Sequence, residues 1–325
     1  MSARRVDVAD LVERAQQGQA RAVARLISLV EDASPELRDV ARALAPHTGH
    51  AQVIGLTGPP GVGKSTTTNV LVGALRRAGK RVGVLAVDPS SPFSGGALLG
   101  DRVRMQDHAL DDGVFIRSMA TRGHLGGIAW ATPQALRVLD AAGCDVVLVE
   151  TVGVGQSEVE VVSLADTTLV LLAPGMGDGI QAAKAGILEV ADVFVVNKAD
   201  RDGADQTIRD LKYMISLGRR ERDGASWRSP IVPTVASKGE GADDVVDAIE
   251  QHRDWMVSHG ELDARRQRRA EAEIEAIAVE QVREKLGYVR RGDDLRALPS
   301  LAKRVVAGEV DPYRAADDLV AELGA

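Results

Sequence analysis

The sequence predicts an α/β protein with a doubly wound, mainly parallel sheet, preceded by N-terminal helices and followed by a C-terminal helical arm. From residue 50 to residue 257, short continuous apolar runs alternate with helical stretches. Such runs are typical of strands buried on both faces, and the helices between them are expected to form right-handed crossovers. At both ends of the chain, apolar residues instead recur at helical spacing. We therefore divide the chain into residues 1–49, 50–257 and 258–325.

The N-terminal segment has the periodicity of helices. Between residues 5 and 46, apolar side chains recur at roughly 3.6-residue spacing, as they do on the buried face of an amphipathic helix. A break from Asp32 to Pro35 separates the second helix from the third, and the turn-forming stretch 46–49 ends the set. Three short helices are therefore expected ahead of the sheet.

The expected sheet has six strands, and each is an apolar run of six or seven residues. They are 52–57, 81–87, 145–150, 167–173, 192–197 and 231–236. Aromatic residues make up only 3% of the chain, so that the core must be built from Val, Leu, Ile and Ala. The alternation of these runs with helices is the pattern of a parallel sheet covered by helices.

The segment 258–325 returns to a helical pattern. Its long helix, residues 261–287, carries an apolar stripe that consists of Ile274, Ala278, Val282 and Leu286. A long helix with one apolar stripe outside the α/β core needs a surface to pack on, in the same subunit or in a second one. We expect a homodimer held by this arm. The arginines within 265–269 could contact RNA, but a solvated helix face is the simpler interpretation.

Composition argues against several classes of function. The net charge of −7 gives no general attraction to nucleic acid or to an anionic membrane. The single cysteine, Cys144, allows no intrachain disulfide and no Cys-based metal site, and we expect it to be a small buried side chain. The six histidines lack metal-binding spacing. Since there is also no long apolar run, we expect a soluble cytoplasmic protein without a membrane or nucleic-acid partner.

The clearest chemical motif lies between the first expected strand and a helix that is expected to begin at Thr66. It reads Gly58-Pro59-Pro60-Gly61-Val62-Gly63-Lys64-Ser65 and fits G-x-x-x-x-G-K-[ST], the phosphate-binding P-loop. Glycines let backbone N–H groups approach the phosphates, and the helix N-terminus adds partial positive charge. Lys64 is expected to reach the β- and γ-phosphates, and the Ser65 hydroxyl is expected to bind Mg²⁺.

Two acidic residues stand at the ends of expected strands. Asp88 follows the run 81–87, and Glu150 closes the run 145–150. In a parallel sheet both carboxyl ends open on the side of the P-loop, where carboxylates can hold Mg²⁺ or its waters. Either residue alone could equally be a helix cap or a solvated strand end. Glu150 also begins a stretch with D-x-x-G spacing, with Glu in place of Asp, so that the Gly153 N–H is expected to sense a γ-phosphate.

A base-recognition motif follows the run 192–197 and reads Asn197-Lys198-Ala199-Asp200. In this N-K-x-D arrangement, the Asp carboxylate accepts hydrogen bonds from the guanine N1–H and the N2 amine. Adenine lacks this donor pair and would leave the carboxylate unpaired, so that GTP and GDP are favoured over ATP. Lys198 can lie over the base, and Asn197 can tie loops together. The segment Ala236-Ser237-Lys238 is positioned to offer a backbone N–H to the guanine O6.

Longer motifs extend this interpretation to a family. They are GPPGVGKST (58–66), VDPSSPFSGGALLGDRVRM (87–105), TRGHLGG (121–127), ETVGVGQSE (150–158), PGMGDGIQAAKAG (174–186) and NKAD (197–200). With these motifs the chain resembles, over nearly its whole length, the MeaB/ArgK/MMAA GTPases, chaperones of adenosylcobalamin-dependent methylmalonyl-CoA mutase. The resemblance implies a GTPase that gates adenosylcobalamin delivery to, and protection of, that mutase.

The resemblance also implies which segments respond to the nucleotide. Residues 88–105 resemble the first switch of the family, with Asp88, Asp101 and Glu150 around the magnesium. Residues 150–158 resemble the second switch. Both segments would then change conformation when the γ-phosphate is lost.

A third switch is implied for the loop 174–186, which would carry the nucleotide state to the mutase. Asp178 and Lys184 are its expected polar actors. From its glycine-rich composition and its place after a strand, this loop could equally be an ordinary connection between a strand and a helix. Only the resemblance favours the switch.

Two other classes of function stay open. One is a kinase or ATPase linked to amino-acid transport, as the ArgK label suggests. A kinase needs an acceptor pocket and usually reads adenine, which Asp200 does not favour. The other is a structural scaffold that binds a nucleotide without hydrolysis, and the complete set of Mg²⁺ and switch motifs argues against it.

Overall fold

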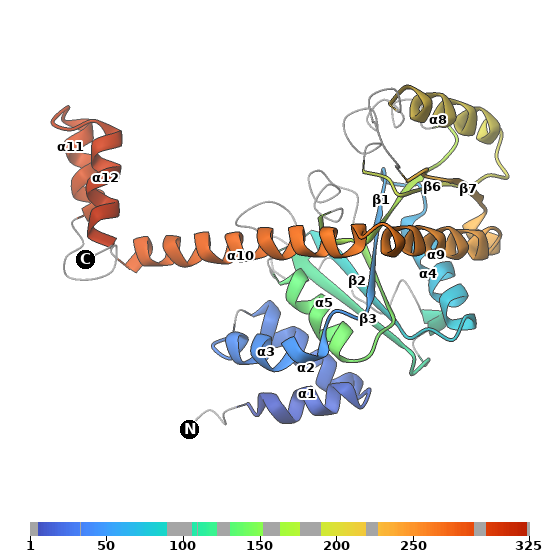
Figure 1. Ribbon diagram of the computed structural model, residues 1–325, viewed down its shortest axis with the longest axis horizontal. Helices are drawn as coiled ribbons and strands as arrows, with labels where there is room; N and C mark the ends of the chain where they lie inside the picture. The colour runs from blue at the N-terminus through green and yellow to red at the C-terminus, as the bar shows by residue number, and fades with distance from the viewer. Residues whose placement is uncertain are drawn as a thin grey trace. The chain divides into compact units, whose positions relative to one another are not determined.

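Figure 1 shows the computed structural model of the chain, which describes residues 6–32, 34–89, 106–108, 110–121, 131–151, 163–175, 190–218, 227–288 and 297–323. By its contacts the chain divides into two units, Met1–Leu262 and Asp263–Ala325. The first unit contains the sheet and the helices around it, and the second contains most of one long helix and the two helices that follow. Among the described helices, none is long and apolar enough to cross a membrane.

Within the described residues, seven parallel strands form the centre of the first unit, in the order β3-β2-β4-β1-β5-β6-β7. They are β1 (Gln52–Thr57), β2 (Val82–Pro89), β3 (Val114–Thr121), β4 (Val146–Thr151), β5 (Thr167–Leu172), β6 (Val193–Asn197) and β7 (Ile231–Thr234). Every residue of β1, β5 and β6 is buried, as continuous apolar runs predict. The predicted doubly wound α/β fold is confirmed.

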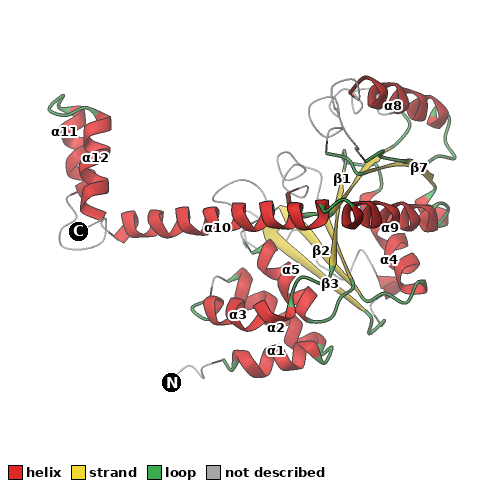
Figure 2. Ribbon diagram, viewed as in Figure 1, coloured by secondary structure: helices red, strands yellow, loops and turns green. Residues whose placement is uncertain are grey.

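Helices cover both faces of this sheet (Figure 2). In this unit they include α1 (Val8–Gln16), α2 (Ala20–Glu31), α3 (Leu37–Leu44), α4 (Lys64–Arg77), α5 (Thr132–Ala141), α8 (Ala204–Gly218) and α9 (Ala242–Ser258). Successive strand residues point to opposite faces. Val53 of β1 therefore packs with α5 and the N-terminal helices, whereas its neighbour Ile54 packs with α4 and α9.

The N-terminal helices share a hydrophobic core with one face of the sheet. Leu26 and Ile27 of α2 are fully buried, in the same cluster as Leu85 of β2 and Leu139 of α5. The three helices that the periodicity predicts are all present. Burial of their apolar faces therefore depends on the sheet, because short amphipathic helices gain most of their stability from tertiary packing.

The sequence prediction located six strands and missed β3. This strand lies at the edge of the described sheet and pairs with β2. Arg117 and Ser118 interrupt its apolar residues, so that it lacks the continuous apolar run used to recognise the other strands. The Arg117 guanidinium forms an ion pair with Glu31 of α2 and donates to Ser28 Oγ at 3.3 Å. An edge strand can carry such polar side chains because only one side of it is paired within the sheet.

The second unit contains α10 (Glu261–Tyr288) from residue 263 on, with α11 (Ala297–Val306) and α12 (Pro312–Leu323). α11 and α12 pack on each other and bury Leu301 and Ala315. On α10, the predicted stripe is exposed within this chain: Ile274 is 66% and Val282 is 49% accessible. The Leu286 side chain lies outside the described part of the chain.

Candidate functional site

The P-loop, residues 58–63, connects β1 to α4 in a conformation that requires its glycines. Gly58, Gly61 and Gly63 have φ angles of 142°, 79° and 98°, in the region that L side chains rarely adopt. A Cβ atom at Gly63 would lie 2.5 Å from Asn197 Nδ2, and one at Gly58 would collide with the Leu171 carbonyl oxygen. The loop can therefore lie directly against Leu171 near the end of β5 and Asn197 at the end of β6.

Lys64 is the first residue of α4 and is 8% exposed. Its Nζ donates to the Gly58 carbonyl and, at 3.3 Å, to the Pro59 carbonyl. The ammonium group is thus folded back over the loop whose N–H groups would surround a phosphate. A phosphate there would meet this ammonium group and the partial positive charge of the helix N-terminus.

Ser65 and Glu150 form the second part of the site. Glu150, on β4, pairs in register with Leu56 of β1, two residues before the P-loop begins. Its carboxylate is 1% exposed and accepts a hydrogen bond from Ser65 Oγ. A hydroxyl and a carboxylate side by side at the P-loop are the hard oxygen donors that Mg²⁺ prefers, so that the residues present fit this ion.

Asn197 joins three separate segments at the end of β6. Its Nδ2 donates to the Val62 carbonyl of the P-loop at 2.8 Å. Its Oδ1 accepts from the Ala236 N–H at 3.0 Å and from Thr234 Oγ1 at 3.3 Å. Because the side chain is 3% exposed, these bonds are shielded from water. The P-loop, the N-K-x-D loop and the segment after β7 are therefore held as one rigid group.

Two further contacts in this loop were not predicted. Lys198 has a φ of 59°, a value rare outside glycine, and its Nζ donates to the Gly61 carbonyl at 2.6 Å. Asp200 Oδ2 lies 3.1 Å from Lys238 Nζ, and this hydrogen bond lowers the pKa of the Asp200 carboxyl and raises that of Lys238. Opposite charges at the ends of neighbouring strands were the available signal for the second contact.

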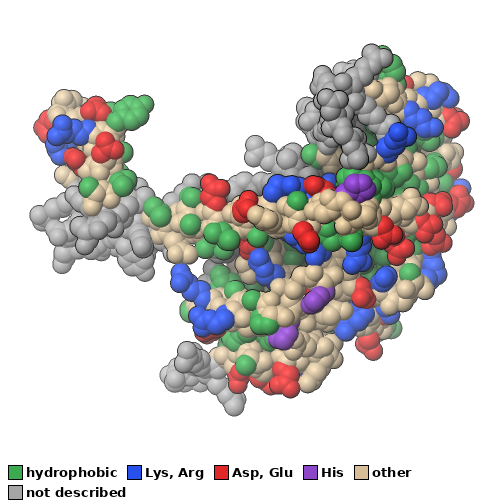
Figure 3. All heavy atoms as spheres, viewed as in Figure 1, with side chains coloured by type: hydrophobic (Ala, Val, Ile, Leu, Met, Phe, Trp, Pro, Cys, Tyr) green, Lys and Arg blue, Asp and Glu red, His purple; other side chains and the backbone are tan. Residues whose placement is uncertain are grey.

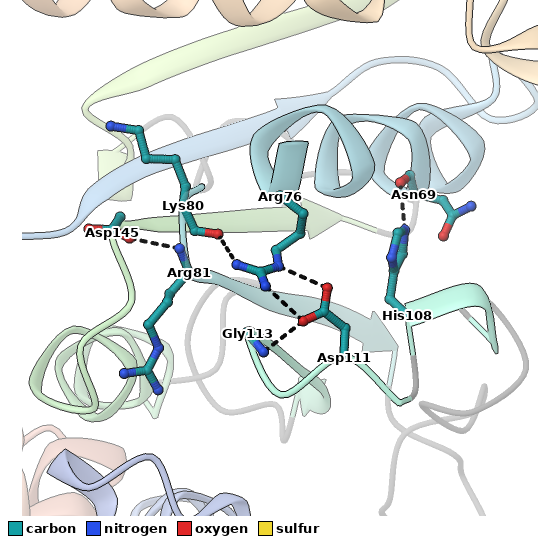
Figure 4. A network of polar contacts seen from close by, with 8 residues as sticks. All are labelled: Asn69, Arg76, Lys80, Arg81, His108, Asp111, Gly113 and Asp145. Carbon is teal, nitrogen blue, oxygen red and sulfur yellow. Dashed lines mark hydrogen bonds and ion pairs between the residues drawn. The ribbon is translucent and has the colours of Figure 1, made fainter. Parts of the chain in front are cut away.

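A polar network anchors the P-loop helix (Figure 4). Arg76, near the end of α4, holds both Asp111 carboxylate oxygens at 2.9 Å and donates to the Lys80 carbonyl at 2.6 Å. The hydrogen bond from Arg76, with a second from the Gly113 N–H at 2.8 Å, lowers the pKa of Asp111. Nearer the P-loop, His108 Nε2–H donates to the Asn69 carbonyl at 3.1 Å. These contacts fix the helix that carries Lys64 and Ser65.

Several predicted site residues lie outside the described part of the chain. They are Asp101, Gly153, Asp178 and Lys184. For Asp88 the structure describes the backbone, in β2, but not the side chain. The remaining predicted residues, Gly58–Thr66, Glu150, Asn197–Asp200 and Ala236–Lys238, lie at the carboxyl ends of β1, β4, β6 and β7.

A family profile matches most of the chain. The family described as "Methylmalonyl Co-A mutase-associated GTPase MeaB" matches residues 23–289, a stretch that contains both the P-loop and the N-K-x-D loop. The chain belongs to the MeaB family of GTPases. GTP hydrolysis and guanine-nucleotide binding follow from this membership, and the resemblance seen in the motifs is confirmed.

Individual relatives of this MeaB-family GTPase agree with the profile. A putative GTPase of Pyrococcus abyssi is 47% identical over 315 residues, which cover 97% of this chain and 96% of the relative. The mitochondrial methylmalonic aciduria type A homolog of Mus musculus is 35% identical over 320 residues, which cover 94% of this chain and 76% of the relative. The solved structure of a LAO/AO transport system kinase aligns over all of both chains, with 27% identity and a TM-score of 0.71.

Proposed function

We propose that this GTPase gates the delivery of adenosylcobalamin to methylmalonyl-CoA mutase and protects that enzyme. The observation that carries the proposal is the family match, since the family's description names the mutase and the match includes both nucleotide-binding loops. The name of the mouse relative refers to the corresponding aciduria. In this proposal GTP hydrolysis serves as a timing step, and the mutase is the partner that reads the nucleotide state.

The phosphate end of the proposed reaction uses the P-loop. Its N–H groups cradle the phosphates, and Lys64 leaves the loop carbonyls to reach the β- and γ-phosphates. Ser65 and Glu150, with Asp88 and Asp101, would hold Mg²⁺, which neutralises charge on the phosphate oxygens when it is bound. Gly153 would report the γ-phosphate through its N–H.

The base end of the site uses the two loops that Asn197 joins. Asp200 would exchange the Lys238 ammonium group for the guanine N1–H and N2 amine, and Lys198 would lie over the ring. Ala236 and Lys238 already use their N–H groups within the protein, which leaves the Ser237 N–H as the donor for the guanine O6. This set of donors and acceptors rejects adenine.

The proposal also concerns rate. Ras-like GTPases place a glutamine directly after D-x-x-G to position the attacking water, whereas Val154 follows Gly153 in this sequence. We expect the isolated protein to hydrolyse GTP well below the ~1–10³ s⁻¹ of ordinary enzymes. A mutase that prefers the GTP state must in turn tighten GTP binding by the same factor, because coupling between two binding sites is reciprocal.

Single-turnover hydrolysis of GTP, measured with and without methylmalonyl-CoA mutase, tests the proposal. We expect slow hydrolysis alone and a changed rate with the mutase present, but not with an unrelated cobalamin enzyme as control. Fast hydrolysis by the protein alone, or the same rate in all three reactions, would leave a GTPase without a mutase-gated switch.

A second candidate is a kinase for amino-acid transport, favoured by the similarity in fold to the LAO/AO transport system kinase. Such a kinase would transfer the γ-phosphate to a protein or small molecule rather than to water. GTP labelled on the γ-phosphate, incubated with the protein and a cell extract as the source of acceptor, distinguishes the two, since a kinase would leave the label on an acceptor instead of releasing all of it as phosphate.

A further inference from the structure

A hollow of about 390 Å³ lies at the amino-terminal ends of β1, β2 and β4, whereas the P-loop follows the carboxyl end of β1. Its volume is within the range of small-molecule sites, ~300–1,000 Å³. Its charged and imidazole side chains are His47, His50, Lys80, Asp140, Asp145 and Arg253. They precede β1, β2 and β4 or belong to α5 and α9, whereas the nucleotide loops follow the carboxyl ends of strands. The hollow is therefore separate from the GTP site.

The two carboxylates of this hollow are engaged by the backbone. The Asp140 carboxylate accepts hydrogen bonds from the three consecutive N–H groups of residues 49–51, at 2.5, 3.2 and 2.9 Å. Asp145 Oδ2 accepts from the Arg81 N–H at 2.7 Å. These bonds hold the segments that form the walls. The backbone thus engages both carboxylates, while Lys80 and Arg253 bring positively charged side chains to the same hollow.

The cationic groups come from segments with fixed backbones. The Lys80 carbonyl accepts from Arg76 at 2.6 Å, and Figure 4 shows the Lys80 ammonium group pointing away from Arg76 and Asp111. Arg253 follows His252 on α9, and the buried His252 ring is hydrogen-bonded to Thr167 at 2.9 Å. On the face drawn in Figure 3, Lys, Arg and His side chains lie among Asp and Glu side chains between α9 and the N-terminal helices.

We propose that this hollow binds a small multivalent anion, either an organic phosphate or a polycarboxylate, independently of the nucleotide. Lys80 and Arg253 provide two cationic side chains, and the His47 and His50 rings provide further polar contacts. Among the described residues, no group of three His, Cys, Asp or Glu side chains could hold a metal ion, so that the imidazoles are not explained as metal ligands. Lys and Arg side chains form charge-assisted hydrogen bonds with the oxygens of phosphates and carboxylates.

The test uses the full-length protein saturated with GDP, without added Mg²⁺, so that the P-loop is filled and the probes cannot compete for the metal. Inorganic pyrophosphate and citrate are titrated separately by calorimetry. We expect at least one to bind, and Lys80→Ala and Arg253→Ala each to weaken it about tenfold or more. Binding of pyrophosphate alone indicates a phosphate ligand, and binding of citrate alone indicates a carboxylate ligand.

Matched controls separate this site from general charge effects. Lys212→Ala on α8 and Arg38→Ala on α3 remove exposed charges elsewhere and should leave the affinity unchanged, and Arg253→Lys should retain most of it. The ring signals of His47 and His50 should shift in NMR spectra of the wild-type protein during the titration. Absence of binding by both probes at millimolar concentration would overturn the proposal. Equal weakening in the Lys212→Ala control, or unshifted His47 and His50 signals on binding, would do the same.

Discussion

Asp200 is the residue on which the choice of base depends. Its hydrogen bond with Lys238 lowers the pKa of the carboxyl group, so that it is ionised and ready to accept the guanine donors. We expect Asp200→Asn to weaken GDP binding about 10- to 100-fold and to improve binding of xanthosine diphosphate, whose C2 oxygen suits an amide donor. Competition calorimetry with GDP, ADP and xanthosine diphosphate measures both changes. Asp202→Asn, an exposed neighbour, is the control, and equal affinity of the wild type for GDP and ADP would contradict the assignment.

Lys64 is the residue on which phosphate chemistry depends. Its Nζ donates to backbone carbonyls of the P-loop, and these are weaker than a triphosphate as acceptors for an ammonium group. We expect Lys64→Ala to lower single-turnover hydrolysis at least ~100-fold, because the charge that develops on the transferred group loses its stabilisation. Phosphate release measures this, and Lys212→Ala should behave as wild type. Normal turnover by Lys64→Ala would show that the catalytic site is elsewhere.

The effect of Glu150 on nucleotide affinity should be larger where binding depends more strongly on Mg²⁺. With the carboxylate removed, the Ser65 hydroxyl loses this hydrogen-bond acceptor, and the ion loses an expected ligand or its support. We expect Glu150→Ala to weaken Mg²⁺-dependent binding of GTP more than that of GDP, since the γ-phosphate adds a contact to the ion. Affinities for a non-hydrolysable GTP analogue and for GDP, each with Mg²⁺ and with EDTA, give the comparison. The same loss for both nucleotides, with and without Mg²⁺, would argue for a purely structural role.

At the scale of elements, the contact between Arg76 and Asp111 should stabilise α4 in a pH-dependent way. The pKa of Asp111 is lower in the folded protein than its ordinary value, mainly through the Arg76 hydrogen bond. Such a carboxyl contributes stability above its unfolded pKa of about 4, and the contribution is lost as the pH falls through the lower folded value. Asp111→Asn should therefore lower the urea midpoint at pH 7.

The difference between the two proteins should begin to shrink as the pH falls below about 4, because the unfolded wild type takes up a proton on Asp111 there first, and it should disappear once the pH has fallen through the lower pKa of the folded protein. Urea midpoints of the wild type and the variant at pH 7 and pH 3.5 measure this change. Asp112→Asn, an exposed residue next to it, should show no such pH dependence. A difference that stays constant over this range would mean that the ionised carboxylate contributes nothing to stability.

At the scale of the whole molecule, we expect a homodimer held by α10. Ile274, Ala278 and Val282 are exposed within the single chain, and apolar side chains in a row on one helix are commonly covered by a partner. The double variant Ile274→Glu and Val282→Glu should convert a dimer into a monomer at micromolar concentration, measured by analytical ultracentrifugation. Glu275→Gln is the control on the same helix. A monomeric wild type, or a dimer that survives the double variant, would contradict the prediction.

The sequence alone determined those features whose signal is local. The P-loop lies within eight consecutive residues, and the N-K-x-D motif within four, so that spacing was sufficient to recognise them. Six strands were predicted because strands buried on both faces are continuous apolar runs. The family was recognisable for the same reason, since its motifs are uninterrupted stretches.

Only the tertiary structure decided the contacts between segments far apart in the chain. The bonds from Asn197 to Val62 and from Lys198 to Gly61 join residues on different strand ends, and no spacing in the sequence encodes them. β3 was missed because an edge strand can carry polar side chains that pack elsewhere, in this case Arg117 on α2. The hollow before β1, β2 and β4 exists because parallel pairing brings the starts of these strands together, and pairing depends on the fold as a whole.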